Sequence, residues 1–404
     1  MSTHSGLRPG HHAPTLLRGE NIIIFSSDDW DSGLKTSKYH IARQLARHNR
    51  VLFVNSIGLR APTAGARDIG RALRKLGSFL CGARKVPEGL HIYTPIVVPF
   101  FRGSSPIKAI NGVLLRLVMR WLTFRLRLFN PIVFAFLPTF NDVVGTLGEK
   151  AIFYYCIDDM RGYRGVDLDW FSREEERLLL RANCTISSAR QLTEEFRARG
   201  YRAYYVPHGV DWVRFRTALD DDLPLPEDMR DIPAPRLGFY GFLSDEWIDY
   251  PLLKRMAGEH PDWHIVLIGR PKAGMDMATL LPEPNIHYLG LKSFDQLPAY
   301  TRHFDVGLIP FGINPLTLHS NPLKLLEYLA GGLPVVVTDI PEARAYQEAV
   351  RIARSQEEYI AQCWAALQDN TPSARERRSR LAQEHSWEKR IEAISEIVCA
   401  RILV

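Results

Sequence analysis

Residues 319–338 read HSNPLKLLEYLAGGLPVVVT, a short helix followed by a glycine pair and an apolar strand. We expect Asn321 to cap the helix, with Pro322 at the first helical position, where a missing N–H group costs nothing. The glycines at 331–332 supply a left-handed stop, and Pro334 begins the strand. A helix that leads directly into an apolar strand is typical of a parallel α/β domain.

The same alternation of strand and helix extends over the rest of the chain. Residues 21–25 (NIIIF) and 51–55 (VLFVN) are apolar strands separated by a helical pattern at 37–48. Such strands indicate a parallel sheet that is buried on both faces. Further N-terminal strands are predicted at 90–94, 132–137, 151–155, 183–187 and 203–206, with a helix near 172–182. C-terminal strands are predicted at 236–240, 263–268, 286–289, 305–309 and 334–338, with helices at 248–258, 294–302, 322–330, 342–348 and 356–368.

The length of 404 residues predicts two domains, because a single hydrophobic core rarely grows beyond about 250–300 residues. We predict an α/β fold in which two Rossmann-like domains with parallel sheets face a central cleft. Ligands of such domains bind at the carboxyl ends of the strands, which places the site in the cleft. The predicted parts are a mobile tail (1–20), an N-terminal domain (21–211), a linker (212–235), a C-terminal domain (236–385) and a final helix (386–404) that packs back on the N-terminal domain.

Two charged residues lie on the otherwise apolar helix at 322–330. Lys324 and Glu327 are three positions apart and therefore share a face. They could pair with each other as a structural ion pair. Alternatively, the helix N-terminus and Lys324 bind a diphosphate, while Glu327 accepts both hydroxyl groups of a ribose. The second interpretation predicts a site for a nucleoside diphosphate.

Five segments together resemble retaining glycosyltransferases of the GT-B type, the broad "group 1", family-four class. The helix segment resembles their donor-binding signature, Pro-x-Lys-x-x-Glu-Tyr-x-Ala-x-Gly-x-Pro-Val-Val. The other four are 206–211 (VPHGVD), like the interdomain element; 237–241 (LGFYG), like the first strand and glycine turn of the donor domain; 265–269 (IVLIG), like its second strand; and 153–159 (FYYCIDD), like an acceptor-domain strand that ends in an acid. Their order and spacing extend the resemblance over most of the chain.

The resemblance implies a hexosyltransferase-like enzyme that moves a sugar from a nucleotide-sugar, a UDP- or GDP-sugar, to a saccharide or lipid-linked acceptor. It implies retention of configuration and a role in cell-surface polysaccharide or glycolipid synthesis, with the acceptor in the N-terminal domain and the donor in the C-terminal domain. The expected catalytic residues are Asp158, His319 and Lys324. The expected donor-binding residues are Gly33, Gly241, Arg270, Asn321, Lys324, Leu325 and Glu327, and the expected acceptor-binding residues are Asp28, Asp29 and His208.

Two segments depart from the family pattern. His319 stands where the family often has a glutamate, eight positions before the helix glutamate. The arginine and lysine that usually follow the glycine turn of the donor domain are absent from 243–247 (LSDEW). We therefore expect Lys324, Arg270, Lys272 and helix N-termini to meet the phosphate charge.

Several candidates also have a purely structural interpretation. Asp28 or Asp29 could cap a helix, and His208 could replace a turn asparagine. The Asp-x-Asp patterns at 29–31 and 167–169 match metal-dependent transferases, but the pattern recurs at 220–222 and is therefore unspecific. We expect no metal and no other cofactor, with helix dipoles and cations stabilising the departing diphosphate.

Positive charge is concentrated in one part of the chain. Residues 60–130 carry 13 Lys or Arg and two acidic residues, whereas the whole chain has a net charge of +6. Such a block favours an anionic partner, and we expect an anionic membrane surface. Residues 110–129 form either an interfacial helix on lipid or a core helix whose arginines reach solvent. A nucleic acid is not expected, because no nucleic-acid-binding signature accompanies the charge.

Five cysteines without close spacing, and a first 20 residues without an apolar run, favour a cytoplasmic protein. It could be peripheral on the inner face of the cell membrane. Two alternatives to a transferase stay open: a sugar-nucleotide epimerase or hydrolase of the same fold, and a non-catalytic sugar-nucleotide-binding protein.

Overall fold

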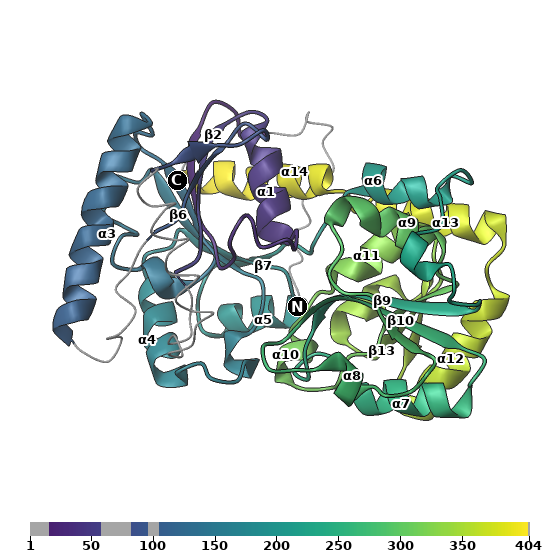
Figure 1. The fold of residues 1–404 in the computed structure, drawn as a ribbon. Helices are drawn as coiled ribbons and strands as arrows, with labels where there is room; N and C mark the ends of the chain where they lie inside the picture. The colour runs from purple at the N-terminus through teal and green to yellow at the C-terminus, as the bar shows by residue number, and fades with distance from the viewer. Residues whose placement is uncertain (1–15, 58–81, 96–104, 403–404) are drawn as a thin grey trace, which may run out of the picture.

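Two β-sheets organise the structure, a computed structural model that describes residues 16–57, 82–95 and 105–402 (Figure 1). Within these residues the N-terminal sheet has the strand order β3-β4-β2-β1-β5-β6-β7-β8, and the C-terminal sheet has the order β11-β10-β9-β12-β13-β14. Neighbouring strands are parallel except in the short β3–β4 pair. The predicted α/β architecture with two mainly parallel sheets is therefore confirmed.

The N-terminal sheet contains eight strands in the described residues: β1 (Asn21–Phe25), β2 (Arg50–Val54), β3 (Arg84–Lys85), β4 (His91–Tyr93), β5 (Ile132–Ala135), β6 (Ala151–Cys156), β7 (Cys184–Ser187) and β8 (Ala203–Tyr205). The accompanying helices are α1 (Ser37–Ala46), α3 (Ser105–Arg125), α4 (Leu168–Leu179) and α5 (Arg190–Ala198), with 3-10 turns η2 (Pro138–Phe140) and η3 (Met160–Gly162).

Alternation along the strands divides the N-terminal core into two layers. Ile22 and Ile24 of β1 pack on the side of α1 and the last helix, whereas Ile23 and Phe25 pack on the side of α3. A strand that buries both faces needs helices on each side. The N-terminal sheet is accordingly sandwiched between two helical layers (Figure 1).

The C-terminal sheet is formed by β9 (Arg236–Leu243), β10 (His264–Pro271), β11 (Ile286–Tyr288), β12 (Val306–Ile309), β13 (Val335–Thr338) and β14 (Val350–Ala353). Around it lie α6 (Trp212–Arg216), α7 (Tyr250–Glu259), α8 (Met277–Leu280), α9 (Leu297–Arg302), α10 (Pro315–Leu318), α11 (Leu323–Ala330), α12 (Gln356–Gln368) and α13 (Pro372–Gln383). The 3-10 turns are η4 (Thr217–Leu219), η5 (Glu227–Met229), η6 (Phe294–Gln296) and η7 (Pro341–Tyr346).

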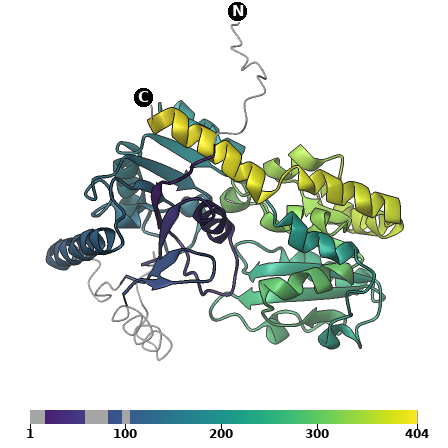
Figure 2. The same ribbon diagram turned by 90° about the horizontal axis from the view of Figure 1, so that it is seen from above.

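The chain returns to the N-terminal domain at its end through α14 (Trp387–Ile402). The backbone amide of Lys389 donates to Ser386 Oγ at 3.4 Å, so Ser386 caps this helix. Figure 2 shows α13 and α14 running from one domain to the other. The apolar face of α14 enters the N-terminal core through Trp387, Ile391, Ile394 and Val398.

Several segments differ from the sequence prediction. Residues 16–20 are not part of a mobile tail, because Leu17 is buried in the core and the Gly19 amide donates to His48 O at 2.9 Å; the rest of that tail, 1–15, lies outside the described residues. The segment 212–235 is not an open linker, since Phe215 and Met229 are fully buried in the C-terminal core. The predicted helix at 342–348 is the 3-10 turn η7.

Candidate active site

The helix α11 begins beside the glycine turn of β9, near the carboxyl end of that strand, and its ends differ slightly from the prediction. Its N-cap is Pro322, without a side-chain hydrogen bond, so Asn321 is not the cap. The Asn321 amide instead donates to Ser188 O of the N-terminal domain at 3.0 Å. At the other end Gly332 has φ +74°, the left-handed conformation that stops a helix.

Lys324 lies above the glycine turn of β9. A Cβ atom on Gly241 would be 3.3 Å from Lys324 Nζ, so the missing side chain leaves room for the lysine. The ammonium lies 4.9 Å from the ring centre of Phe239 and 5.1 Å from that of Phe311. Burial lowers the pKa of Lys324 to about 8, against the attraction of Glu327 and Asp158. An anion bound here would raise the pKa of Lys324 again and favour the charged form.

Glu327 is buried one turn further along α11, with 8% of its surface exposed. Burial raises its pKa to about 7, although the Lys324 charge and the Tyr240 side chain oppose this shift. Among the described residues Glu327 and Lys324 form no ion pair within 4.0 Å with each other or with another side chain. The alternative that they serve only as a structural pair is therefore not supported, and both charges remain available to a ligand.

Arg270 and Lys272, the other two side chains expected to contact phosphate, differ in their surroundings. Arg270, at the end of β10, donates to Ser32 O of the N-terminal domain at 3.1 Å. Lys272 is engaged within the protein, at 2.9 Å from Asp245 and 3.1 Å from Glu246. We therefore retain Arg270 as a donor candidate and assign Lys272 to the internal network.

Asp28 and Asp158 approach from the N-terminal sheet. Asp28 follows β1 and lies 3.1 Å from Lys38 Nζ and 2.8 Å from the Thr36 hydroxyl. Burial would raise the pKa of Asp28, but Lys38 and Thr36 hold it below its usual range. Burial raises the pKa of Asp158, opposed by the charges of Lys38 and Lys324. Asp158 thus lies in the electrostatic field of a cation from each domain.

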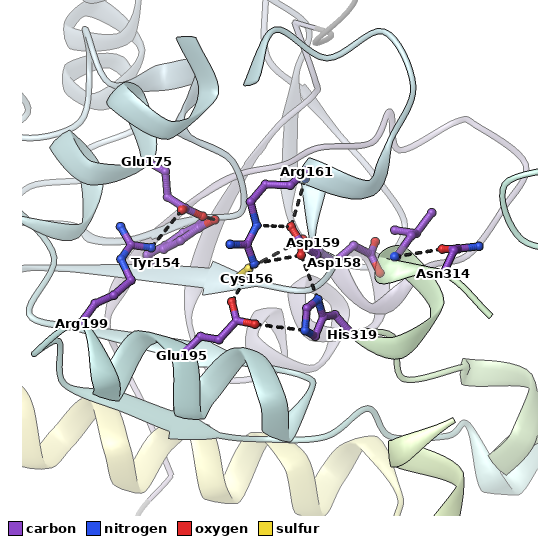
Figure 3. A network of polar contacts seen from close by, with 11 residues as sticks. Tyr154, Cys156, Asp158, Asp159, Arg161, Glu175, Glu195, Arg199, Asn314 and His319 are labelled. Carbon is purple, nitrogen blue, oxygen red and sulfur yellow. Dashed lines mark hydrogen bonds and ion pairs between the residues drawn. The ribbon is translucent and has the colours of Figure 1, made fainter. Parts of the chain in front are cut away.

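A network of ion pairs joins the two domains at His319 (Figure 3). His319 Nδ1 lies 2.8 Å from Asp159 Oδ2, and His319 Nε2 lies 3.1 Å from Glu195 Oε1. Arg161 binds Asp159 through two nitrogens, at 2.7 and 2.9 Å, and reaches Glu195 at 2.6 Å. The hydrogen bond to Asp159 raises the pKa of His319, while His319 and Arg161 hold the pKa of Asp159 at about 2 against the effect of burial. His319 is thereby a contact between domains.

The remaining expected site residues occupy different environments. Gly33 (φ +83°) lies against the C-terminal domain, since a Cβ there would be 3.3 Å from Leu291 Cδ2. Asp29 is partly exposed and lies in a turn in which its carbonyl oxygen accepts from the Ser32 amide. The Leu325 side chain is in the C-terminal core and its amide donates to Pro322 O, so we drop Leu325 from the donor set. His208 is 3% exposed and packs on Trp387, which removes it from the acceptor set.

A cavity of about 520 Å³ opens between the domains beside the carboxyl end of β11. The N-terminal wall includes Gly33, Lys35 and Tyr39, and the C-terminal wall includes Leu291 and Phe294. It continues the row of strand ends that carries Gly241 and Arg270. A ligand held at α11 can therefore extend along this edge.

The Asp-x-Asp patterns serve local structure. Asp31 pairs with Arg84, and the Asp167 side chain accepts from the Trp170 amide at the start of α4. Within the described ranges no three His, Cys, Asp or Glu side chains are placed to hold a metal ion.

Sequence reasoning missed four residues that shape the site: Lys38, Asp159, Arg161 and Glu195. Lys38 could have been found from the sequence. It lies in the first turn of a helix that follows an acidic loop, and a lysine in that position is close to the loop. The partners of His319 carried none, since Asp159 lies 160 positions away in the chain.

Part of the chain matches a known protein family. Residues 236–369 match the family model of glycosyl transferases group 1. Over these residues the C-terminal domain is therefore similar to the group 1 glycosyl transferases.

Individual relatives are more distant. The chain is 25% identical over 224 residues to the "Putative teichuronic acid biosynthesis glycosyltransferase TuaH" of Bacillus subtilis (strain 168), a match that covers 53% of this chain and 56% of that protein. The chain thus spans about half the length of this curated relative.

Two solved structures share the fold over nearly the whole chain. They are a sucrose-phosphate synthase of Thermosynechococcus elongatus (TM-score 0.67, 11% identity, 94% of this chain and 98% of that one) and Anabaena HepE in complex with UDP and glucose (TM-score 0.64, 13% identity, 94% and 99%). At these identities the similarity shows the GT-B fold alone.

Proposed function

We propose that this protein transfers a sugar from a UDP- or GDP-sugar to a saccharide or lipid-linked acceptor, without a metal ion and with retention of configuration. The observation that carries the proposal is the pair Lys324 and Glu327, which is buried at the carboxyl edge of the sheet without an ion pair between the two charges within the described chain. Two opposite charges left unpaired in this position are explained by a ligand that carries both an anion and hydroxyl groups.

In the proposed complex the donor lies along the strand ends of the C-terminal domain. Glu327 accepts the ribose hydroxyls, while Lys324, Arg270 and the N-terminus of α11 face the diphosphate. The cavity beside Leu291 provides room for the rest of the nucleoside. The uridine-containing complex of Anabaena HepE makes UDP-sugars the first donors to test.

The reaction we propose is a front-face displacement. The acceptor oxygen bonds to the anomeric carbon as the bond from that carbon to the β-phosphate oxygen breaks. The acceptor proton passes to the departing phosphate oxygen, so no protein nucleophile is required. Lys324 and the α11 N-terminus stabilise the negative charge that develops on the diphosphate, and Asp158 and Asp28 orient the acceptor hydroxyls.

We place this activity in the synthesis of a cell-surface polysaccharide or glycolipid, in the cytoplasm or on the inner face of the cell membrane. The match to a Bacillus subtilis protein named for teichuronic acid biosynthesis supports the first part. Acidic and basic side chains on the cleft wall suit a polar, hydroxyl-rich acceptor.

The test begins with a thermal-shift screen against UDP-, GDP-, ADP- and dTDP-sugars, followed by donor turnover with and without acceptor saccharides. We expect a UDP- or GDP-sugar to raise the unfolding temperature, and its consumption to depend on an acceptor. Turnover at the same rate without acceptor would indicate the epimerase or hydrolase alternative. Tight binding without turnover across acceptors would indicate a non-catalytic binding protein.

A further inference from the structure

The helix α3 has two apolar faces. Leu115, Met119 and Leu122 pack into the N-terminal core. A second set of large apolar side chains recurs at intervals of three or four residues, which places the set in one stripe along the helix. The outer stripe consists of Ile110, Val113, Leu114, Leu117, Trp121 and Phe124, all of them exposed.

The exposure of the outer stripe is large for side chains of this kind. Phe124 is 71% exposed, Leu117 59% and Trp121 52%, and Phe129 just beyond the helix is 56% exposed. Soluble monomers rarely display contiguous apolar patches of this type unless the patch meets a partner or a membrane. The stripe is therefore a candidate surface for contact with a partner or a membrane.

Arginines border the outer stripe on both sides. At 100° per residue, Arg116 and Arg120 fall on one flank and Arg125 on the other. Arg116 Nε donates to Asp142 O at 3.2 Å and Arg120 Nε donates to Thr146 O at 3.1 Å. These two hydrogen bonds hold both arginine side chains in place. The Arg125 guanidinium lies 5.3 Å from the Trp121 ring centre.

The surroundings of α3 add to this positive charge. The sequence contains no acidic residue between Glu88 and Asp142. On the Arg116 flank a cavity of about 370 Å³ is lined by Arg116, Arg177 and Arg181 and by one acid, Asp142. Arg177 pairs with Glu174 at 2.7 Å, so the positive charge of this flank comes chiefly from Arg116 and Arg181. An anionic occupant is favoured over a second copy of this stripe, because two copies would oppose their arginines.

We propose that the outer stripe of α3 docks onto an anionic lipid bilayer, with the helix parallel to the membrane plane. Apolar side chains would enter the acyl boundary while the flanking arginines meet headgroup phosphates. No described helix could cross a bilayer, so the contact is interfacial. The sequence left open whether this segment is a core helix or an interfacial helix, and α3 has one face for each role.

The position of α3 suits such attachment. The helix lies at the end of the N-terminal domain that is remote from the C-terminal domain in both views (Figures 1 and 2). Docking there would leave the C-terminal domain free to close on a donor. Only the purpose of attachment, access to a lipid-linked acceptor, rests on the proposed function. Attachment itself requires no catalysis. The basic residues at 60–81 and 96–104 lie outside the described residues.

Vesicle flotation tests the docking surface directly. We expect the wild-type protein to float with vesicles of phosphatidylcholine and phosphatidylglycerol in equal amounts, to remain behind with pure phosphatidylcholine, and to be released by high salt. The pair Trp121→Ser with Phe124→Ser should abolish flotation, whereas Trp364→Ser, at a residue 58% exposed on the other domain, should not. Arg120→Glu with Arg125→Glu should weaken binding at least about tenfold, and the exposed control Arg230→Glu should not.

Nucleotide titration of the same preparations separates this inference from the proposed function. Stripe variants that keep wild-type affinity for the nucleotide are folded, so their loss of flotation is a loss of the docking surface. Wild-type protein that fails to float, or stripe variants that float normally, would overturn the inference whatever the nucleotide result. A concentration-dependent dimer that the stripe variants dissociate would also overturn it, in favour of a protein interface.

Discussion

At the scale of single residues, the site combines charges that water would normally screen. Lys324 and Glu327 are both buried, and burial shifts their pKa values toward each other, to about 8 and about 7. A nucleoside diphosphate would favour the charged form of each, the lysine through its phosphates and the carboxylate through its ribose hydroxyls.

These shifts predict the pH dependence of nucleotide binding. Below about pH 7 Glu327 gains a proton and loses acceptor capacity, and above about pH 8 Lys324 loses its charge. Affinity for UDP or GDP should be highest between these values and fall by up to roughly tenfold per pH unit on either side. Titration calorimetry across this range would measure it. A flat profile would show that neither group contacts the ligand.

Residue chemistry on one short segment could be predicted, whereas contacts between distant segments could not. The spacing of Lys324 and Glu327 is local, and so the sequence located the pair. The partners of His319 depend on how the domains meet, and Asp159 has no feature that distinguishes it from Asp158 in sequence. Burial removed Leu325 and His208 from the expected set, because their side chains fill space between elements.

At the scale of secondary-structure elements, apolar runs determined what could be predicted. The parallel strands are short and continuously apolar, and their order along the chain fixes the α/β class. By contrast α13 was missed, because PSARERRSRLAQ has few apolar residues to mark a buried face. Tertiary contacts hold this helix: Arg378 is buried and donates to Gly332 O at 2.9 Å, beside the end of α11.

The last helix provides the clearest stability test among the elements. Trp387 is 1% exposed in the N-terminal core, whereas Trp364 on α12 is 58% exposed. Trp387→Ala should lower the free energy of unfolding by about 3–5 kcal/mol, from lost burial and the cavity left behind. Trp364→Ala should change it little. Denaturant unfolding of both variants checks the difference, and equal effects would contradict the docking of α14.

At the scale of the whole molecule, the two domains meet through ion pairs and hydrogen bonds around the cleft. His319 of the C-terminal domain contacts Asp159 and Glu195 of the N-terminal domain, and Arg270 reaches Ser32 O. Polar contacts of this kind can exchange with water, which suits domains that separate and close during a reaction cycle.

Protonation of His319 should favour the closed arrangement. Its pKa is raised above 6.5 by Asp159, so its stabilising contribution is complete below pH 6.5 and is lost as the pH rises through the raised value. Small-angle X-ray scattering should show a larger radius of gyration above that pH. His319→Gln should remove this pH dependence, whereas the exposed control His48→Gln should keep it. An unchanged profile in His319→Gln would exclude the histidine as the cause.

The most direct test of the donor site is titration calorimetry of the wild type, Glu327→Gln and the exposed control Glu194→Gln with UDP and GDP. We predict that one nucleotide binds the wild type and Glu194→Gln with equal affinity, and that Glu327→Gln binds at least about tenfold more weakly while keeping its unfolding temperature. Equal affinity in all three proteins would contradict the account, because the ribose would then lie away from α11.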